Sequence, residues 1–391
     1  MEKASKKVWK HYYKDFTSSL KSEPFRRGTA RATSNYEKGI KETFDKFPES
    51  PELAKEVRAI KEYSISHHRE LLDVAKQKFE DIGAKVLIVK NRQEALDTFK
   101  EIIGSGKVIV KGKSMTTEEI RLREFLIDQN NEVWETDLGE FIIQLNKERP
   151  MHIVNPSLHV PREEIAKLFS KHLGSKLDPN DVNGMVLAAR KFLREKYYSA
   201  DFGIIGANVV SAQDAKVVTI HNEGNITLSS VLPENLIIFT GIEKIVPTLE
   251  DALKTAFVTS RYVKYKIAGY YNVFGSSSDF RSRNVYLILI DNGRSDIISN
   301  PVFREAAYCV RCGACMYPCP VFKVVAGKFG GPTYVGGIGA IWTWFIDGKE
   351  PAIPPLFSCM DDGSCRIACP VDIDIPGLIH KLKREVIRDS A

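Results

Sequence analysis

Hydrophobic positions follow two different periods along the chain. In the first 82 residues, apolar side chains recur at helical spacing within a polar background, in EKGIKETFDKF and in PELAKEVRAIKEYSISHHRELLDVAKQKFEDIG. Pro51 suits the first turn of one long helix over the second of these stretches, with Ser50 as its cap and Gly83 at its end. The pattern therefore predicts a helical N-terminal arm.

From Gly83 to about Gly293, short β-branched runs alternate with helical stretches. The expected strands are KVLIV, KVIVKG, NEVWET, HIVNP, FGIIGANVV, KVVTIHN, NLIIFTG and NVYLILIDNG. The expected helices are RQEALDTFKEII, TTEEIRLREFLIDQN, PREEIAKLFSKHL, DVNGMVLAARKFLREKYY and TLEDALKTAF. This alternation is typical of an α/β domain with a mostly parallel sheet. Ligands of such sheets bind beyond the carboxyl ends of the strands, where we expect a pocket.

Polar and charged side chains follow several of the expected strands. Lysines and a hydroxyl group after KVIV, at the start of a helix, suit an anion or carboxylate. The candidate pocket residues are Lys111, Lys113, Ser114, Asp137, Glu140, Asn222, Glu223 and Asn225. The same residue types also cap helices and close turns in any fold, so a purely structural role is the alternative. The strands are followed by neither a glycine-rich dinucleotide fingerprint nor a P-loop, so neither NAD nor ATP is supported.

All seven cysteines lie in two runs near the end of the chain, CVRCGACMYPCP and CMDDGSCRIACP. The first run has the C-x2-C-x2-C-x3-C-P spacing of a bacterial-type ferredoxin half-site, whose fourth cysteine ligates the other cluster. The second run repeats this frame, with Asp362 in place of one cysteine. The expected ligands of cluster I are Cys309, Cys312, Cys315 and Cys369. Those of cluster II are Cys319, Cys359 and Cys365, with Asp362 as a candidate fourth ligand.

A carboxylate is a harder ligand than a thiolate and should hold its iron less tightly. We therefore predict a [4Fe-4S] cluster at site I, and at site II a [4Fe-4S] cluster that can lose iron to become [3Fe-4S]. Structural zinc also uses cysteine pairs, but two thiolate triplets leave too many thiols for tetrahedral sites. Disulfides are disfavoured because seven is an odd number and the spacing is too tight for several bridges.

Composition limits the remaining choices. With 391 residues, 43% hydrophobic and 27% charged, the chain suits a soluble globular protein of two or three domains. The net charge of +6 is spread along the chain, so nucleic-acid binding is not indicated. Reduced thiols and the lack of an apolar N-terminal leader favour the cytoplasm, with any membrane contact made through a partner. The uncharged stretch 329–346 is rich in glycine and is expected to cover the clusters, not to form a transmembrane segment.

Several strand-end motifs resemble one known family. VKGKSMTTEEI, ETDLGEFIIQL, RPMHIVNPSLH, GANVV, HNEGN, GIEKIVPTLEDAL and DNGRS resemble the LUD domain of lactate-utilisation proteins. With the two cysteine runs behind them, the chain resembles the iron–sulfur B subunits of three-subunit lactate-utilisation systems. The resemblance implies an α/β core like that of sugar-phosphate isomerases and CoA transferases. We expect an N-terminal helical arm over 1–82, this LUD-type domain over 83–298 and an α-helical, two-cluster, ferredoxin-like domain over 299–391.

The resemblance also implies a function. It implies oxidation of L-lactate to pyruvate by a complex whose other subunits are partners of this chain, with the chain passing electrons through its two clusters. Since the sequence carries no flavin motif, the catalytic centre is expected on a partner. One alternative keeps the clusters but serves another 2-hydroxy acid or a heterodisulfide-reductase-like partner. A second alternative makes the α/β domain itself an enzyme or a sensor, with the clusters as a redox gate.

Overall fold

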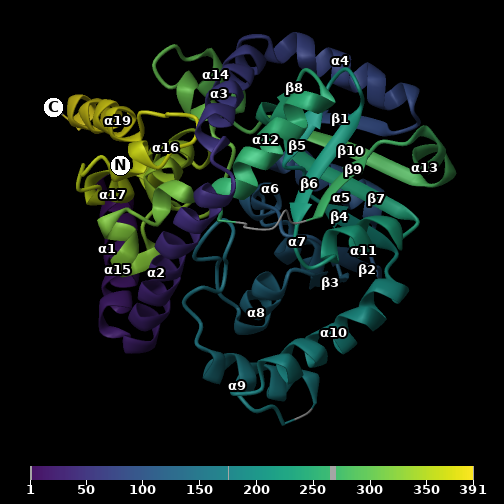
Figure 1. Ribbon diagram of the computed structural model, residues 1–391, viewed down its shortest axis with the longest axis horizontal. Helices are drawn as coiled ribbons and strands as arrows, with labels where there is room; N and C mark the ends of the chain where they lie inside the picture. Colours follow the sequence, from purple (N-terminus) through teal and green to yellow (C-terminus); the bar gives the residue numbers. More distant parts are fainter. Residues whose placement is uncertain (1, 175, 265–269, 391) are drawn as a thin grey trace.

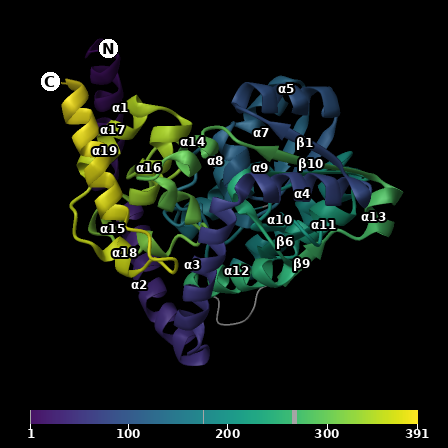
Figure 2. The ribbon, with the colours of Figure 1, turned by 90° about the horizontal axis from the view of Figure 1, so that it is seen from above.

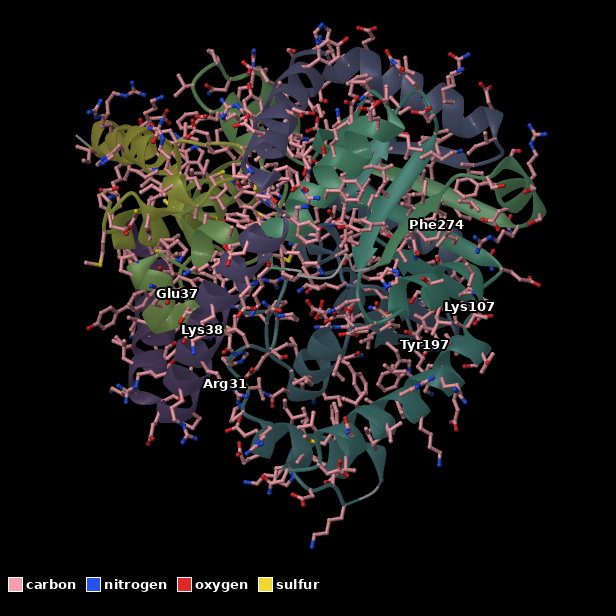
Figure 3. The ribbon with its side chains drawn as sticks, in the orientation of Figure 1. Arg31, Glu37, Lys38, Lys107, Tyr197 and Phe274 are labelled. Atoms are coloured by element: carbon pink, nitrogen blue, oxygen red, sulfur yellow. The ribbon has the colours of Figure 1, made fainter. Side chains whose placement is uncertain are left out.

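Two bodies lie side by side in the computed structural model, which describes residues 2–174, 176–264 and 270–390 (Figure 1). One is an α/β body that contains both sheets. The other is a helical body formed by the two ends of the chain, drawn in purple and yellow and seen to one side of the sheets in Figure 2. Side chains of α2 such as Arg31, Glu37 and Lys38 mark the helical body, and Lys107 and Phe274 mark the α/β body (Figure 3).

The larger sheet is parallel throughout, as predicted. Among the described residues its order is β1 (Lys85–Val89), β10 (Asn284–Ile290), β7 (Asn235–Gly241), β4 (Phe202–Ile205), β2 (Val108–Lys111) and β3 (Glu132–Glu135). Its central strands are continuous apolar runs and are buried, as a sheet covered on both faces requires.

Helices cover this sheet and extend beyond its edge. On one face, α5 (Arg92–Ile103) packs Phe99 against Phe239 of β7, with ring centroids 5.2 Å apart. The predicted helix over 116–130 forms two short helices instead, α6 (Met115–Glu119) and α7 (Leu122–Asp128), because Arg121 between them adopts φ 52°. Beyond the β3 edge, a second hydrophobic cluster joins α8 (Leu138–Asn146), α9 (Arg162–Leu173) and α10 (Val182–Ser199). The short helix α11 (Asn225–Val231) packs against strand β4.

A smaller sheet lies beside the first. Its order is β8 (Ile245–Val246), β5 (Val209–Ser211), β6 (Lys216–His221) and β9 (Tyr270–Phe274), with antiparallel pairs on both sides of β6. The helix α12 (Leu249–Tyr262) covers it, and α13 (Ser277–Ser282) leads into β10. Residues 202–210, expected as one run, are thus divided between the two sheets.

The prediction of a strand over HIVNP is wrong. The segment bends, and the Nδ1 atom of His152 accepts hydrogen bonds from the backbone N–H groups of Val154 and Asn155, each at 3.0 Å. These donors would otherwise serve a strand ladder. The bend carries Ile153 towards the helical body, where it becomes part of the candidate site.

The N-terminal region is helical, as predicted, but the expected single helix from Pro51 is broken at His67. Its four helices are α1 (Glu2–Lys21), α2 (Glu23–Lys46), α3 (Ser50–Ser66) and α4 (His68–Asp81). Pro51 does lie in a first turn, but Ser50 is not the cap, because its hydroxyl donates to the carbonyl oxygen of Phe47. The first two helices pack against the C-terminal helices, and the next two pack against the α/β body.

The helical body is completed by the C-terminal segment. Its elements are α14 (Arg294–Ser299), η2 (Arg304–Tyr308), η3 (Ala314–Met316), α15 (Pro320–Val325), η4 (Ala326–Lys328), α16 (Gly336–Ile346), α17 (Lys349–Ser358), α18 (Ser364–Ile367) and α19 (Ile375–Ser390). One hydrophobic core runs from the smaller sheet into α16, where Trp342 is fully buried. Within the described part of the chain, no helix is long and apolar enough to cross a membrane.

Candidate metal centre and strand-end pocket

Four of the seven cysteines line one cavity in the helical body. Cys309, Cys312 and Cys315 come from the loop that follows η2, and Cys369 comes from the loop after α18. The remaining lining is apolar apart from Gly313 and consists of Ile153, Val310, Ile338, Pro370, Val371, Ile373 and Ile375. The structure therefore brings together the four thiols that the spacing assigned to cluster I, which we call the first thiol set.

The other three cysteines form a second thiol set nearer the surface. Cys319 precedes α15, Cys359 follows α17 and Cys365 lies in α18. Burial, together with the nearby Cys359, Cys319 and Asp362, raises the pKa of the Cys365 thiol to about 12. The two residues that border this set, Met360 and Ile367, are 70% and 89% exposed. The second set thus opens towards solvent, whereas the first lies deeper in the helical body.

The buried thiols are arranged as ligands of a cation. Burial, together with the nearby Cys309 side chain, raises the pKa of Cys369 to about 12. Metal binding deprotonates such thiols and compensates their mutual repulsion. Backbone donors are also present, since the N–H group of Ile373 lies 3.4 Å from Cys369 Sγ. Within the described ranges, no group of three or more Cys, His, Asp or Glu is placed to hold a single metal ion. The sulfur atoms surround a space instead.

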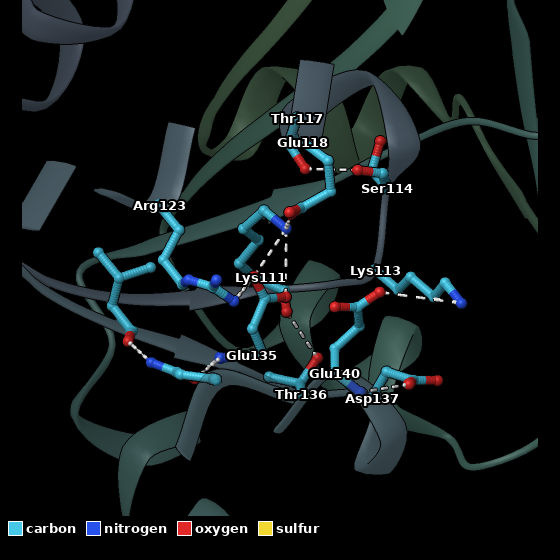
Figure 4. A network of polar contacts seen from close by, with 12 residues as sticks. Lys111, Lys113, Ser114, Thr117, Glu118, Arg123, Glu135, Thr136, Asp137 and Glu140 are labelled. Atoms are coloured by element: carbon cyan, nitrogen blue, oxygen red, sulfur yellow. Dashed lines mark hydrogen bonds and ion pairs between the residues drawn. The ribbon is translucent and has the colours of Figure 1, made fainter. Parts of the chain in front are cut away.

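At the strand ends of the α/β body, Lys111 is the centre of a buried ion network (Figure 4). Its Nζ atom lies 2.9 Å from Glu135 Oε1 and 3.2 Å from Glu118 Oε1, and Arg123 Nη1 lies 3.3 Å from the same Glu135 oxygen. Lys111 and Glu135 are both fully buried. Despite burial, which lowers it, the pKa of Lys111 is raised by these carboxylates, so the ammonium group is charged and already paired. Its position indicates a structural role.

Lys113, two residues further on, has fewer partners. Its Nζ atom lies 3.8 Å from Glu140 Oε1, too far for a hydrogen bond, and neither the Nζ atom nor the two Glu140 carboxylate oxygens have a hydrogen-bond partner among the described residues. Asp137 caps α8 by accepting a hydrogen bond from the Glu140 N–H group at 3.0 Å. Burial lowers the pKa of Lys113 and raises that of Glu140. The geometry therefore leaves the Nζ atom of Lys113 less firmly paired than that of Lys111, and so more available to a ligand.

A cavity of about 150 Å³, which we call the junction cavity, lies beyond these strand ends and against the helical body. Of the predicted pocket residues, five line it: Lys113, Ser114, Asp137, Asn222 and Asn225. Lys111 and Glu140 do not line it. Glu223 faces a different groove, which Asn225 also borders, and accepts a hydrogen bond from the N–H group of Leu138.

Three further residues of the junction cavity were missed from the sequence. Lys244, Thr219 and Arg311 all line it, and Arg311 belongs to the cysteine loop, between Cys309 and Cys312. Nothing in the local sequence separates these residues from ordinary surface or strand positions. Arg311 reaches the cavity because its backbone adopts φ 63°, which a sequence pattern does not reveal.

A chain of buried charges holds Arg311 in place. Arg311 Nη2 lies 3.3 Å from Glu243 Oε1, and the other Glu243 oxygen accepts a hydrogen bond from Arg294 Nε at 2.6 Å. Arg294 also makes two hydrogen bonds of 2.9 Å to Glu119. The guanidinium of Arg311 lies 3.6 Å from the ring centre of Trp342. The cysteine loop is thereby tied to the strand ends of the α/β body.

Comparisons with known proteins relate both bodies to described families. The sequence matches the LUD domain over residues 72–297 and the 4Fe-4S dicluster domain over residues 305–373. It is 33% identical to lactate utilization protein B 1 of Bacillus mycoides (strain KBAB4), over 94% of this chain and 81% of that protein. It is 34% identical to lactate utilization protein B of Shouchella clausii (strain KSM-K16), over 85% and 71%. A crystal structure of a DUF162 family protein from Deinococcus radiodurans aligns with 11% identity and a TM-score of 0.33, over 57% of this chain and 98% of that one.

Proposed function

Since this chain belongs to the LUD-domain family of lactate utilisation proteins and carries a 4Fe-4S dicluster domain, we propose that it is the electron-transfer subunit of a complex that oxidises L-lactate to pyruvate. The observation that carries this proposal is the position of Cys369, which comes from the second cysteine run but lines one cavity with Cys309, Cys312 and Cys315. Such crossed sharing of cysteines is the arrangement of two-cluster ferredoxins.

In this proposal, the first thiol set holds a [4Fe-4S] cluster, and the second set holds another with Asp362 near its fourth corner. Iron–sulfur clusters exchange single electrons when bound. The chain contributes the surroundings that set their potentials. Ile153 and Ile338 exclude water from the first set, and the cationic Lys61 and Arg311 interact with Cys309. Positive charge near a cluster favours its reduced form.

The depths of the two sets suggest a direction for the electrons. The first set faces the α/β body, and the second is bordered by the exposed side chains of Met360 and Ile367. We assign the second set to exchange with a redox partner that docks over these two residues. Oxidation of L-lactate releases two electrons and two protons, so the centre that splits this pair for single-electron carriers belongs to a partner subunit.

The test is an anaerobic purification followed by iron and sulfide analysis and EPR. We expect about eight irons per chain and, after mild oxidation, a [3Fe-4S] signal from the second set. Cys369→Ser should remove the signal of the first cluster, and Cys365→Ser should remove that of the second. A colourless chain that holds zinc and no iron would refute the proposal. Oxidation of L-lactate with a dye by the purified chain alone would show that no partner centre is needed.

A second candidate function is favoured by the junction cavity. Its available lysine suits an α/β domain that itself binds or converts a small molecule, with the clusters as a redox gate. Isolation of the native complex discriminates among these roles, because partners of a lactate-oxidising complex, of another 2-hydroxy-acid oxidase or of a heterodisulfide-reductase type would copurify. Stabilisation by a small molecule without any partner would favour the second candidate.

A further inference from the structure

The junction cavity has an excess of positive charge on its walls. Lys113 and Lys244 approach from the α/β body and Arg311 from the cysteine loop, against the single carboxylate of Asp137. Two of the three cations are already engaged: Lys244 Nζ donates to the carbonyl oxygen of Ala207 at 2.7 Å, and Arg311 pairs with Glu243. Lys113 lies 3.8 Å from the Glu140 carboxyl and has no hydrogen-bond partner for its Nζ atom among the described residues. The cavity therefore suits an anion.

Two polar groups on the cavity wall lack a hydrogen-bond partner among the residues that the structure describes. These are the Nζ atom of Lys113 and the hydroxyl of Thr219, a residue of β6 that is 2% exposed. A buried polar group without a partner costs about 1–3 kcal/mol, and natural structures contain few of them. A ligand with oxygen atoms at both positions would satisfy the ammonium and the hydroxyl together.

The volume of the cavity limits the size of the ligand. An apolar protein cavity of about 150 Å³ holds benzene, so about six non-hydrogen atoms fit here. The walls are divided between polar groups and apolar ones such as Ile153, Val154 and Ile226. A carboxylate of two or three carbons with one further oxygen matches both the size and the mixed lining. Phosphorylated sugars and nucleotides are too large.

The cavity shares walls with the first thiol set. Ile153 lines both spaces, and Arg311 lies between two cysteines of that set while its side chain lines the junction cavity. In the same short loop Val310 faces the thiols. A left-handed backbone is unusual for a residue other than glycine and occurs often at functional sites. At Arg311 it occurs in a residue that lines the junction cavity and whose guanidinium interacts with Cys309.

We propose that the junction cavity binds a small 2-hydroxy- or 2-oxo-carboxylate through Lys113, Arg311 and Thr219, and that binding is linked to the redox state of cluster I. The link rests on the proposed electron-transfer function, whereas the binding does not. An anion beside Arg311 offsets the positive charge near the cluster and so favours its oxidised form. By linkage, the carboxylate binds the oxidised protein more tightly than the reduced protein. A tenfold preference corresponds to a fall of about 59 mV in the midpoint potential.

The experiment uses the anaerobically purified, iron-loaded chain. L-lactate, pyruvate, lactamide and inorganic phosphate are titrated separately by calorimetry, and the midpoint potential is measured with and without the ligand that binds. Lys113→Met removes the available cation, and Thr219→Val removes the hydroxyl at nearly constant volume. Lys107→Met is the matched control, because Lys107 precedes β2, at the end of the strand opposite to Lys113, and its side chain is 42% exposed (Figure 3).

We expect binding of L-lactate or pyruvate by the native chain and by Lys107→Met, with a loss of about 10-fold to 100-fold in Lys113→Met. Thr219→Val should lose less, and a lower potential should accompany binding. Equal binding of lactamide or preferential binding of phosphate would overturn the carboxylate assignment. No binding to a chain that carries its clusters would overturn the site and leave the electron-transfer role intact. Binding to a chain that holds no iron would support the site and refute the electron-transfer role.

Discussion

Replacement of Arg294 by methionine should destabilise the junction between the two bodies. Arg294 is fully buried, as are both carboxylates that it contacts, Glu119 and Glu243. Methionine fills a similar length but cannot donate a hydrogen bond. In the variant, Glu243 still has Arg311 as a partner, at 3.3 Å. Among the described residues, Glu119 retains only two neutral donors, Tyr334 at 2.8 Å and Asn292 at 2.7 Å. The substitution therefore leaves one buried carboxylate without a cation.

The size of the effect follows from that unpaired charge. Removal of one partner from a buried ion pair costs about 3–5 kcal/mol, much more than loss of an exposed pair. For a chain of 391 residues we expect the unfolding midpoint to fall by about 4–6 °C. Glu119→Gln should recover part of the loss when combined with Arg294→Met, because the stranded charge is then gone. The coupling free energy between the two sites should exceed about 1 kcal/mol.

The assay is thermal unfolding of the iron-loaded chain under anaerobic conditions at one scan rate, followed by circular dichroism and tryptophan fluorescence. The fluorescence reports on the junction because Arg294 lies over the ring of Trp342. Lys55→Met, which breaks an exposed pair with Glu52, is the control and should leave the midpoint unchanged. A midpoint for Arg294→Met within 2 °C of the native value, or purely additive effects in the double variant, would refute the reasoning.

Three other changes follow from the structure. Although burial opposes ionisation, Arg294 and Arg311 lower the pKa of Glu243 to about 2. The ionised carboxylate therefore contributes about 3 kcal/mol to the free energy of unfolding above about pH 4.5, and this contribution is lost as the pH falls towards 2. Glu243→Gln should flatten the acid limb of the unfolding curve measured by circular dichroism. Asp362→Cys completes the second cysteine motif and should abolish the [3Fe-4S] EPR signal after mild oxidation; persistence of that signal would show that the carboxylate does not cause the loss. Thr248→Ala removes the hydroxyl that accepts the Asp251 N–H group, which is one half of the capping box of α12, and should cost about 1 kcal/mol in chemical denaturation, whereas Thr248→Ser should cost less than half of that.

The features that were predictable are those set by local pattern. Residues 236–239 and 285–290 are apolar runs, and they form central strands of the parallel sheet because both faces of that sheet are covered. The spacing of the cysteines predicted that Cys369 would lie with the first run, since short loops restrict where sulfur atoms can point. Family membership was also visible, in the strand-end motifs and the cysteine runs together.

The features that were not predictable depend on tertiary contacts. The strand β8 has only two residues and exists because β5 pairs with it. HIVNP has the composition of a strand, but the ring of His152 takes the backbone donors. The break at His67 follows no proline or glycine. Lys244 and Arg311 meet at the junction cavity from segments far apart in sequence, so no local pattern could unite them.

The helical body draws on both ends of the polypeptide, with α1 and α2 packed on α15 and α17 across about three hundred intervening residues. During translation α1 and α2 lack these packing partners until the ribosome has made α15 and α17. The iron-binding half of the molecule can thus assemble only after α15 and α17 have been made, so we expect iron to be delivered after these helices are synthesised. A truncation at either terminus should produce the same defect, loss of iron, although only one terminus carries cysteine.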